Sequence, residues 1–144
     1  MTRRVFVGAT LSAPFLVGLN PAAAQTTIRM ATSWSGGVHL EAYARGFAKE
    51  VESLTQGRVR FQVFPAGTIG SALKVTETVQ RRIAPAGHHW SGYDWGIDKT
   101  SVLVGGYAGS PGIEAFIHWL YEAGGLKLWQ DWRMERFGVV ALPC

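Results

Sequence analysis

The fold is decided by the stretch TIRMATSWSGGVHLEAYARGFAKEVESLTQGRVRFQVFP, residues 27–65. Residues 27–34 are rich in strand-forming side chains and end at Ser35-Gly36-Gly37, which predicts a β-strand followed by a turn. Residues 58–64 alternate between polar and apolar up to Pro65, which predicts a second strand. Between them, residues 39–55 carry apolar side chains at intervals of three or four, which predicts an amphipathic helix with a stripe formed by Leu40, Tyr43, Phe47, Val51 and Leu54.

The same alternation of strand and helix continues beyond this unit. A second helix is expected after Ser71, with its apolar side formed by Leu73, Val75, Val79 and Ile83. Residues 84–90 predict a third, short strand, although Pro85 weakens it. The order β-α-β-α-β predicts an α/β fold with a parallel sheet. Further helices are expected over 113–122 and 126–137, with Gly105–Gly112 as a loop and a fourth strand at 139–142.

Residues 1–24 have the order of a secretory signal peptide. Met1–Arg4 is positively charged, residues 5–19 are apolar, and Ala22 and Ala24 supply the small residues of a cleavage site. We expect cleavage after Ala24, which leaves residues 25–144 outside the cytoplasm, in the periplasm. The adjacent arginines also resemble a twin-arginine export signal, so the choice between that route and the Sec route stays open.

Length and composition exclude several classes of protein. The 144 residues are enough for one domain, and the 47% of hydrophobic residues exclude general disorder. The single cysteine, Cys144, cannot form a disulfide within the chain or a cysteine-based metal site. The net charge is +4, of which Arg3 and Arg4 supply two, and the other basic residues are scattered, so no nucleic-acid surface is predicted. Beyond the N-terminus no apolar run reaches the roughly 20 residues of a membrane span.

Common catalytic motifs are absent from the sequence. It has no G-x-S-x-G elbow, no phosphate-binding P-loop and no H-E-x-x-H pair. His88 and His89 are adjacent on a predicted strand, so they point to opposite faces and cannot chelate one ion; we expect one to pack inward and the other to face outward. Asp94 and Asp98 have the spacing of one helical face, which allows an acid–base pair, but their Gly-rich surroundings favour solvated loop carboxylates.

Aromatic residues mark the predicted ligand end of the sheet. Trp34, Trp90, Tyr93 and Trp95 lie in loops that follow predicted strands, and ligands bind at the carboxyl ends of strands in open α/β sheets. Tyrosine and tryptophan supply rigid apolar walls together with a polar group. We therefore expect Trp34 and Tyr93 to line a small-molecule pocket. The tryptophans on amphipathic helices are expected to fill the core instead; they are Trp119, Trp129 and Trp132.

A set of short motifs resembles a known protein family in order and spacing. The motifs are MATSW (30–34), FAKEV (47–51), TQGRV (55–59), QVFPAG (62–67), GYDWG (92–96) and WLYE (119–122). Together they resemble the periplasmic solute-binding subunit of tripartite ATP-independent periplasmic (TRAP) transporters, the DctP-like family, and in particular its branch that binds 2-oxo acids and related carboxylates. The resemblance runs from Ile28 to Cys144.

The resemblance implies a fold, a ligand and partners. The fold is a periplasmic-binding-protein-type α/β lobe, the ligand a small organic acid, and the partners the membrane permease subunits of the transporter. In this branch an aromatic residue at the position of Tyr93 lines the ligand site, with Trp34 and Trp95 as its neighbours. No cofactor is implied; the residues that hold sodium and the arginine that clamps the ligand carboxylate lie beyond the last residue of this chain.

Members of the family are more than twice as long as this chain. We therefore expect residues 25–144 to be the N-terminal portion of such a protein, truncated after Cys144. The clamp arginine and half of the two-lobed site are then missing. We expect this portion alone to be marginally folded and to bind no carboxylate measurably in a calorimetric titration.

Two other classes of function stay open from the sequence alone. One is a secreted α/β enzyme acting on a small acid, with Asp94 or His88 as the base. The other is an interaction fragment that binds no ligand. Any turnover would identify the first, and the absence of binding to pyruvate-like acids would identify the second.

Overall fold

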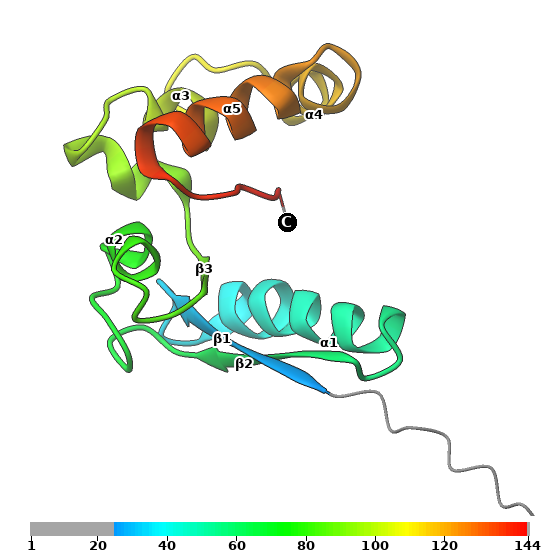
Figure 1. Ribbon diagram of the computed structural model, residues 1–144. Coiled ribbons are helices and arrows are strands. Elements are labelled where there is room, and N and C mark those ends of the chain that lie inside the picture. The colour runs from blue at the N-terminus through cyan, green and yellow to red at the C-terminus, as the bar shows by residue number, and fades with distance from the viewer. Residues whose placement is uncertain (1–24, 144) are drawn as a thin grey trace, which may run out of the picture.

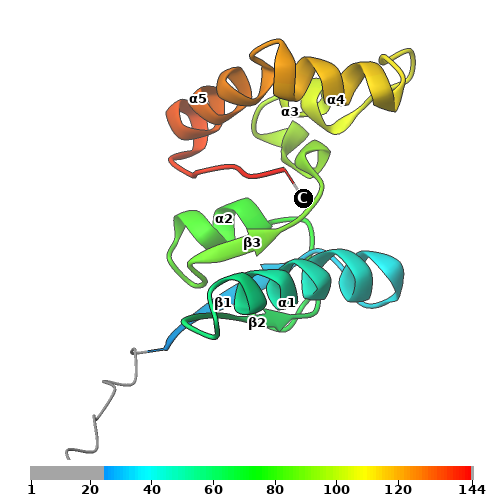
Figure 2. The same cartoon turned by 90° about the vertical axis from the view of Figure 1, so that its right-hand side faces the viewer.

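The computed structural model describes residues 25–143, and the predicted signal peptide and Cys144 lie outside this range. Two parts face each other in both views: a three-stranded sheet with its helices, and a layer of helices formed by the second half of the chain (Figures 1 and 2). The last residues, 139–143, run through the space between them. Among the described residues no helix has both the length and the apolarity needed to cross a membrane.

The sheet contains the predicted strands β1 (Thr26–Thr32), β2 (Val59–Phe64) and β3 (Ala86–His88) in the order β2-β1-β3. Both pairings are parallel, with Met30 opposite Val63 on β2 and Ala86 on β3. This confirms the parallel β-α-β-α-β start. β3 is shorter than expected because Pro85 has no backbone N–H to donate and the strand begins only after it.

Both faces of the central strand are covered by helices. Met30 packs with Leu40 and Ala44, and Ala31, on the opposite face, packs with Val75 and Ala84. Successive residues of a strand point to opposite sides, so β1 is buried on both, as is usual for parallel sheets. This three-layer packing forms the core of the sheet part.

The first helix begins and ends where its periodicity predicted, but its first turn is wider than an α-helix. Residues His39–Ala44 (η1) are wound as a π-helix, with the Arg45 N–H bonded to the Leu40 carbonyl, and α1 follows at Arg45–Leu54. The buried stripe is Leu40, Ala44 and Ala48, whereas Tyr43 and Leu54 of the predicted stripe are 50% and 80% exposed. The π-turn changes the phase of the helix, which is why the stripe differs.

The second helix, α2 (Val75–Gln80), is shorter than predicted. Leu73 and Ile83 lie outside it and are 60% and 46% exposed. Of the predicted apolar side, only Val75 and Val79 therefore belong to the helix. Val75 is the residue that packs on the sheet, against Ala31.

The helical layer consists of η2 (Ser91–Gly96), α3 (Ser101–Gly105), α4 (Ile113–Glu122) and α5 (Gly125–Phe137). α4 and α5 confirm the predicted helices, whereas α3 takes up the start of the predicted Gly-rich loop. The predicted fourth strand at 139–142 is wrong: it pairs with no strand among the described residues. Gly138, at φ +64°, ends α5 and turns the chain into the space between the two parts. There the Ala141 carbonyl accepts a hydrogen bond from the Gln130 side chain and not from a neighbouring strand.

Candidate functional site

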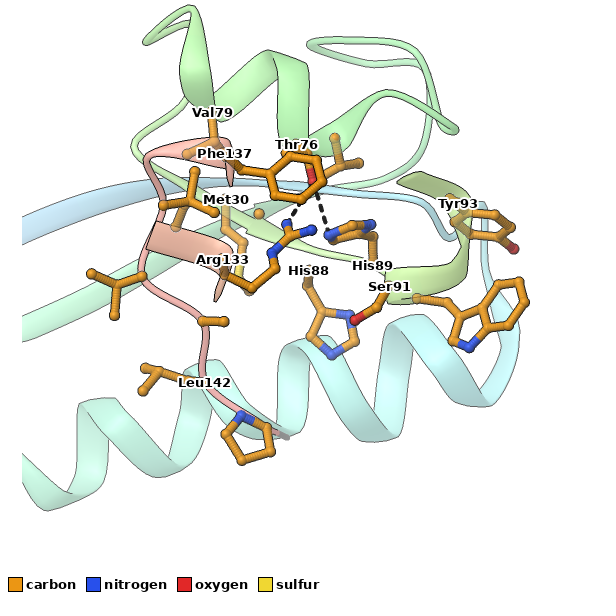
Figure 3. A pocket seen from close by; sticks show the side chains of 18 of the residues that line it. Met30, Thr76, Val79, His88, His89, Ser91, Tyr93, Arg133, Phe137 and Leu142 are labelled. Carbon is orange, nitrogen blue, oxygen red and sulfur yellow. Dashed lines mark hydrogen bonds between the residues drawn. The ribbon is translucent and has the colours of Figure 1, made fainter. Parts of the chain in front are cut away.

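A cavity of about 1110 Å³ lies between the sheet part and the helical layer. Its lining comes from the carboxyl end of β1, from η1, from β3 and η2, from α5 and from the C-terminal segment (Figure 3). This is the end of the sheet at which the sequence placed a ligand site. The polar side chains that face it from the sheet side and from α5 include His88, His89 and Arg133.

Aromatic rings gather at the carboxyl ends of β1 and β3. The Trp34 ring stacks on His39 with centroids 4.9 Å apart and lies 6.2 Å from the ring of Tyr93. Tyr93 in turn meets Trp90 edge to face at 5.3 Å. The two Trp-Ser-Gly loops, 56 residues apart in sequence, therefore form one aromatic cluster on the cavity, consisting of Trp34, His39, Trp90 and Tyr93.

Of the three residues predicted to bind a ligand, the structure brings two together. Trp34 and Tyr93 both line the cavity. Trp95 lies at the far end of η2, is 60% exposed and is not among the lining residues. The predicted core tryptophans are only half-buried, and Trp129 of α5 also lines the cavity.

His88 is the histidine that packs inward. It is 8% exposed, and its Nδ1 accepts a hydrogen bond of 2.6 Å from the indole Nε1–H of Trp34. Burial lowers the pKa of His88, with a smaller contribution from the neighbouring His39. The imidazole is therefore neutral at pH 7, and the proton that Nδ1 lacks must be on Nε2. His88 Nε2 is buried and has no hydrogen-bond partner among the described residues.

His89 does not face solvent, so this half of the expectation for the histidine pair is wrong. Its side chain is 13% exposed and lies on the other face of β3, with Nε2 3.2 Å from the Thr76 hydroxyl of α2. The two histidines cannot share an ion, as their opposite directions predicted. Burial lowers the pKa of His89 to about 4, against the attraction of Asp94 and with a further lowering by Arg133.

Asp94 is not a solvated loop carboxylate, so this prediction is wrong. It is 2% exposed, and its Oδ2 accepts bonds of 2.5 Å from Arg133 Nη1 and 2.7 Å from the Thr76 hydroxyl. Arg133 Nη2 also donates to Thr76 Oγ1 at 2.9 Å. With its Oδ2 already engaged by two donors, this buried carboxylate is not placed to take a proton from a ligand. Asp98 has a separate partner, Arg136 at 2.9 Å, so the two aspartates form no acid–base pair.

Arg133 and Thr76 were not predicted as site residues. The signal for Arg133 is its spacing from Trp129 and Phe137, four residues away on either side, which puts a guanidinium on the aromatic face of α5. In the structure the guanidinium lies 4.3 Å from the centroid of the Phe137 ring. Thr76 gave no comparable signal, because its partners Asp94 and Arg133 are 18 and 57 residues away in sequence.

The residues that the structure describes contain no group of three or more histidine, cysteine, aspartate or glutamate side chains placed to hold a metal ion. The polar groups that the described residues place on the cavity can form hydrogen bonds. Together with the aromatic walls they form a site suited to a small polar organic molecule.

Comparison with known proteins agrees with this geometry. No family model matches the chain. A monocarboxylate 2-oxoacid-binding periplasmic protein from Nostoc sp. is 32% identical over 117 residues, which is 80% of this chain and 31% of that protein. The curated relative is a binding protein by name and not an enzyme.

Solved structures of TRAP periplasmic solute-binding proteins share the fold. The protein from Bordetella bronchiseptica, solved with calcium and picolinate, superposes with a TM-score of 0.73 at 20% identity over 78% of this chain and 34% of its own. The Colwellia psychrerythraea protein, with calcium and pyruvate, gives 0.71 at 18% identity. The Pseudoalteromonas atlantica protein, with sodium and pyruvate, gives 0.70 at 23% identity, and each of these two matches covers 83% of this chain and 36% of the other.

The chain thus spans about a third of the length of the relatives that it matches. Within that span the predicted α/β fold is confirmed, and two of the quoted motifs, MATSW and GYDWG, supply Trp34 and Tyr93 of the aromatic cluster. Over this third of their length, the chain resembles a 2-oxoacid-binding periplasmic protein in sequence and the solute-binding proteins of TRAP transporters in fold.

Proposed function

We propose that this chain is part of an extracytoplasmic solute-binding protein that captures a small carboxylate of the 2-oxo acid type for a TRAP transporter. The membrane permease subunits would be its partners. The observation that carries the proposal is the aromatic cluster: Trp34 and Tyr93 come together on a cavity at the carboxyl ends of two parallel strands. The names of the similar proteins, which bind 2-oxo acids or pyruvate, support the choice of ligand.

In this proposal the ligand lies against the cluster, with Trp34 and Tyr93 as apolar walls and the Tyr93 hydroxyl as a hydrogen-bond donor. Trp95 is kept as a neighbour on η2 and not as a contact. Arg133 also lines the cavity, but Asp94 and Thr76 already engage its guanidinium, so it is not free to clamp a carboxylate. Without such an ionic partner, the binding of an acid to the described residues should be weak.

Binding can be tested by nuclear magnetic resonance of the full chain in a titration with pyruvate. We expect the indole N–H signal of Trp34 and the ring signals of Tyr93 to shift saturably at millimolar concentration, which corresponds to about 4 kcal/mol of binding free energy. Trp119, which does not line the cavity, is the internal control. Absence of a selective shift at Trp34 and Tyr93 would contradict the proposal.

Export is the second part of the proposal. Residues 1–24 would serve as the signal peptide, and residues 25–144 would form the N-terminal portion of the binding domain in the periplasm, as the periplasmic relatives suggest. N-terminal sequencing of the exported protein should give Gln25 as the first residue. Recovery of a periplasmic product that begins at Met1 or Thr2 would show that residues 1–24 are not a cleaved signal.

A further inference from the structure

The His88 imidazole has one of its two nitrogens unused. Nδ1 accepts the Trp34 indole N–H at 2.6 Å, whereas Nε2 has no partner among the described residues although it is buried. An acceptor at Nδ1 requires the neutral tautomer with its proton on Nε2. Trp34 thereby determines both the tautomer and the orientation of a ring that is more than nine-tenths buried.

An unpaired N–H in such a position is costly, because a buried donor without an acceptor loses its bonds to water and gains none in return. His88 lines the cavity, as Trp34 and Tyr93 do, and Figure 3 shows His88 and Tyr93 among the lining side chains. An oxygen that enters from the cavity is the group that would satisfy it. Buried polar atoms that remain unpaired in a folded protein need such an explanation.

The surroundings of His88 favour an acceptor over a donor or a cation. His39 of η1 stacks on the Trp34 ring, Tyr93 comes from η2, and His89 directly follows β3. The nearest carboxylate on η2, Asp94, is bonded to Arg133 of α5 and to Thr76 of α2, and so is not free to accept from His88. Glu41 of η1 is exposed and paired with Arg45, so neither this carboxylate nor Asp94 competes with a ligand oxygen for the Nε2–H.

We propose that the His88 Nε2–H donates a hydrogen bond to an oxygen of the bound acid, its carboxylate or its keto oxygen, and that Trp34 is the residue that positions this donor. The inference rests on the proposed function and adds a residue that selects the ligand. A ligand that places an N–H group at this point, such as the ammonium of a 2-amino acid, would face a donor and be rejected. Pyruvate would therefore bind in preference to alanine.

The first test uses the unaltered chain labelled with ¹⁵N in histidine. Without ligand, the ring nitrogens of His88 should report the Nε2–H tautomer. Addition of pyruvate should shift the Nε2 and Hε2 signals while the tautomer is kept, and alanine should not shift them. If Trp34 and Tyr93 respond to pyruvate while His88 Nε2 does not, the inference is wrong and the proposed function stands. If none of the three responds, both are wrong.

The second test compares variants in the same titration. His88→Met removes the donor and should weaken pyruvate binding about tenfold, whereas His88→Gln keeps an N–H donor and should bind more tightly than the Met variant. His118→Met, on the exposed side of α4, is the matched control and should change nothing. Equal affinity of the Met variant and the unaltered chain would overturn the inference.

Propionate, which lacks the keto oxygen, separates the two acceptors. If His88 donates to the carboxylate, His88→Met weakens propionate and pyruvate equally; if it donates to the keto oxygen, only pyruvate is weakened. Trp34→Phe keeps the ring but removes the donor to Nδ1, so a mixture of His88 tautomers should appear together with weaker binding. A single unchanged Nε2–H tautomer in this variant would refute the positioning role of Trp34.

Discussion

The Thr76 hydroxyl is the point at which three elements meet. It donates to Asp94 Oδ2, and its lone pairs accept from Arg133 Nη2 at 2.9 Å and face His89 Nε2 at 3.2 Å. Since the single hydroxyl proton is used on the carboxylate, the network itself requires a proton on His89 Nε2. One oxygen thus contacts the residue that follows β3 and side chains of η2 and α5.

Thr76→Val should therefore destabilise the protein by about 1–3 kcal/mol, because it keeps the shape of the side chain but leaves buried polar groups without a partner. Denaturant unfolding measures the change. The exposed Thr68 supplies the control, since Thr68→Val should alter stability by no more than about 0.5 kcal/mol. A Thr76 variant as stable as this control would show that the network contributes little.

His89 should make stability depend on pH. Its folded pKa is about 4 and its unfolded value 6.5, so between these values the unfolded chain binds the extra proton. Stability is then greatest above about pH 7 and falls toward pH 4, by roughly 3 kcal/mol from this residue. His88, whose pKa is also lowered, acts in the same direction. Unfolding measured over this pH range should show a smaller slope in His89→Gln, and an unchanged slope would contradict the assignment.

Tyr93 distinguishes a ligand contact from a packing role. Tyr93→Phe should cost about 0.5–1.5 kcal/mol of pyruvate binding, or up to about 3 kcal/mol if the acceptor is charged, with little change in the melting temperature. The titration and a thermal melt measure the two quantities separately. A lower melting temperature with unchanged affinity would mean that Tyr93 only packs against Trp34 and Trp90.

At the scale of the elements, β3 and α2 pack closely at Gly87. A Cβ built on Gly87 would lie 2.4 Å from Val75 Cγ1 and 3.1 Å from Val79 Cγ2, so α2 can approach the strand only because residue 87 has no side chain. Gly87→Ala should destabilise the protein by about 1–3 kcal/mol.

The matched control for Gly87 is Gly46 in α1, where a Cβ meets nothing within 4 Å. Gly46→Ala should stabilise the helix by about 0.5–1 kcal/mol. Urea unfolding of both variants measures the two effects. If Gly87→Ala is as stable as the unaltered chain, α2 does not pack on β3 as described.

The elements that the sequence predicted are those defined by local patterns. The alternation of residues 58–64 and the apolar periodicity from Leu40 need no distant partner to be recognised, and the strand and the helix that they predict are both present, although the buried stripe of the helix differs. The fourth strand failed because a strand exists only when another strand pairs with it, and Val139–Leu142 has no such neighbour among the described residues. The site residues divide in the same way. Trp34 and Tyr93 were predicted because each follows a strand, which is a local pattern. The Asp94–Arg133 pair joins residues 39 positions apart, so no local pattern could indicate it.

At the scale of the molecule, a few polar contacts join the helical layer to the sheet part. Arg133 of α5 reaches Thr76 of α2, and the Gln80 side chain donates to the Phe137 carbonyl at 2.8 Å. The Trp90 indole N–H also bonds to the Gly105 carbonyl, which holds α3 against the start of η2. Thr76 and Gln80 of α2 therefore hold α5 to the sheet part, while the buried Asp94–Arg133 pair that Thr76 contacts lies within the helical layer.

Arg133→Leu should loosen the helical layer selectively. It leaves Asp94 buried without its cation, a change that costs about 3–5 kcal/mol in comparable cases. Hydrogen exchange should then become faster in α4 and α5, while β1 and α1 stay protected. Arg136→Leu is the control, because its bond to Asp98 is on the surface and such pairs contribute at most about 1 kcal/mol. Equal acceleration in all elements would mean that the parts unfold as one unit.

The π-wound turn His39–Ala44 affects how this protein should be aligned with others. Such a turn holds one residue more than the α-helical turn that it replaces. A protein that lacks one residue here can form a continuous α-helix between the same end points. A correct alignment of such a protein opens a single-residue gap between His39 and Arg45. An alignment without the gap displaces every earlier position by one and compares Trp34 with the wrong residue.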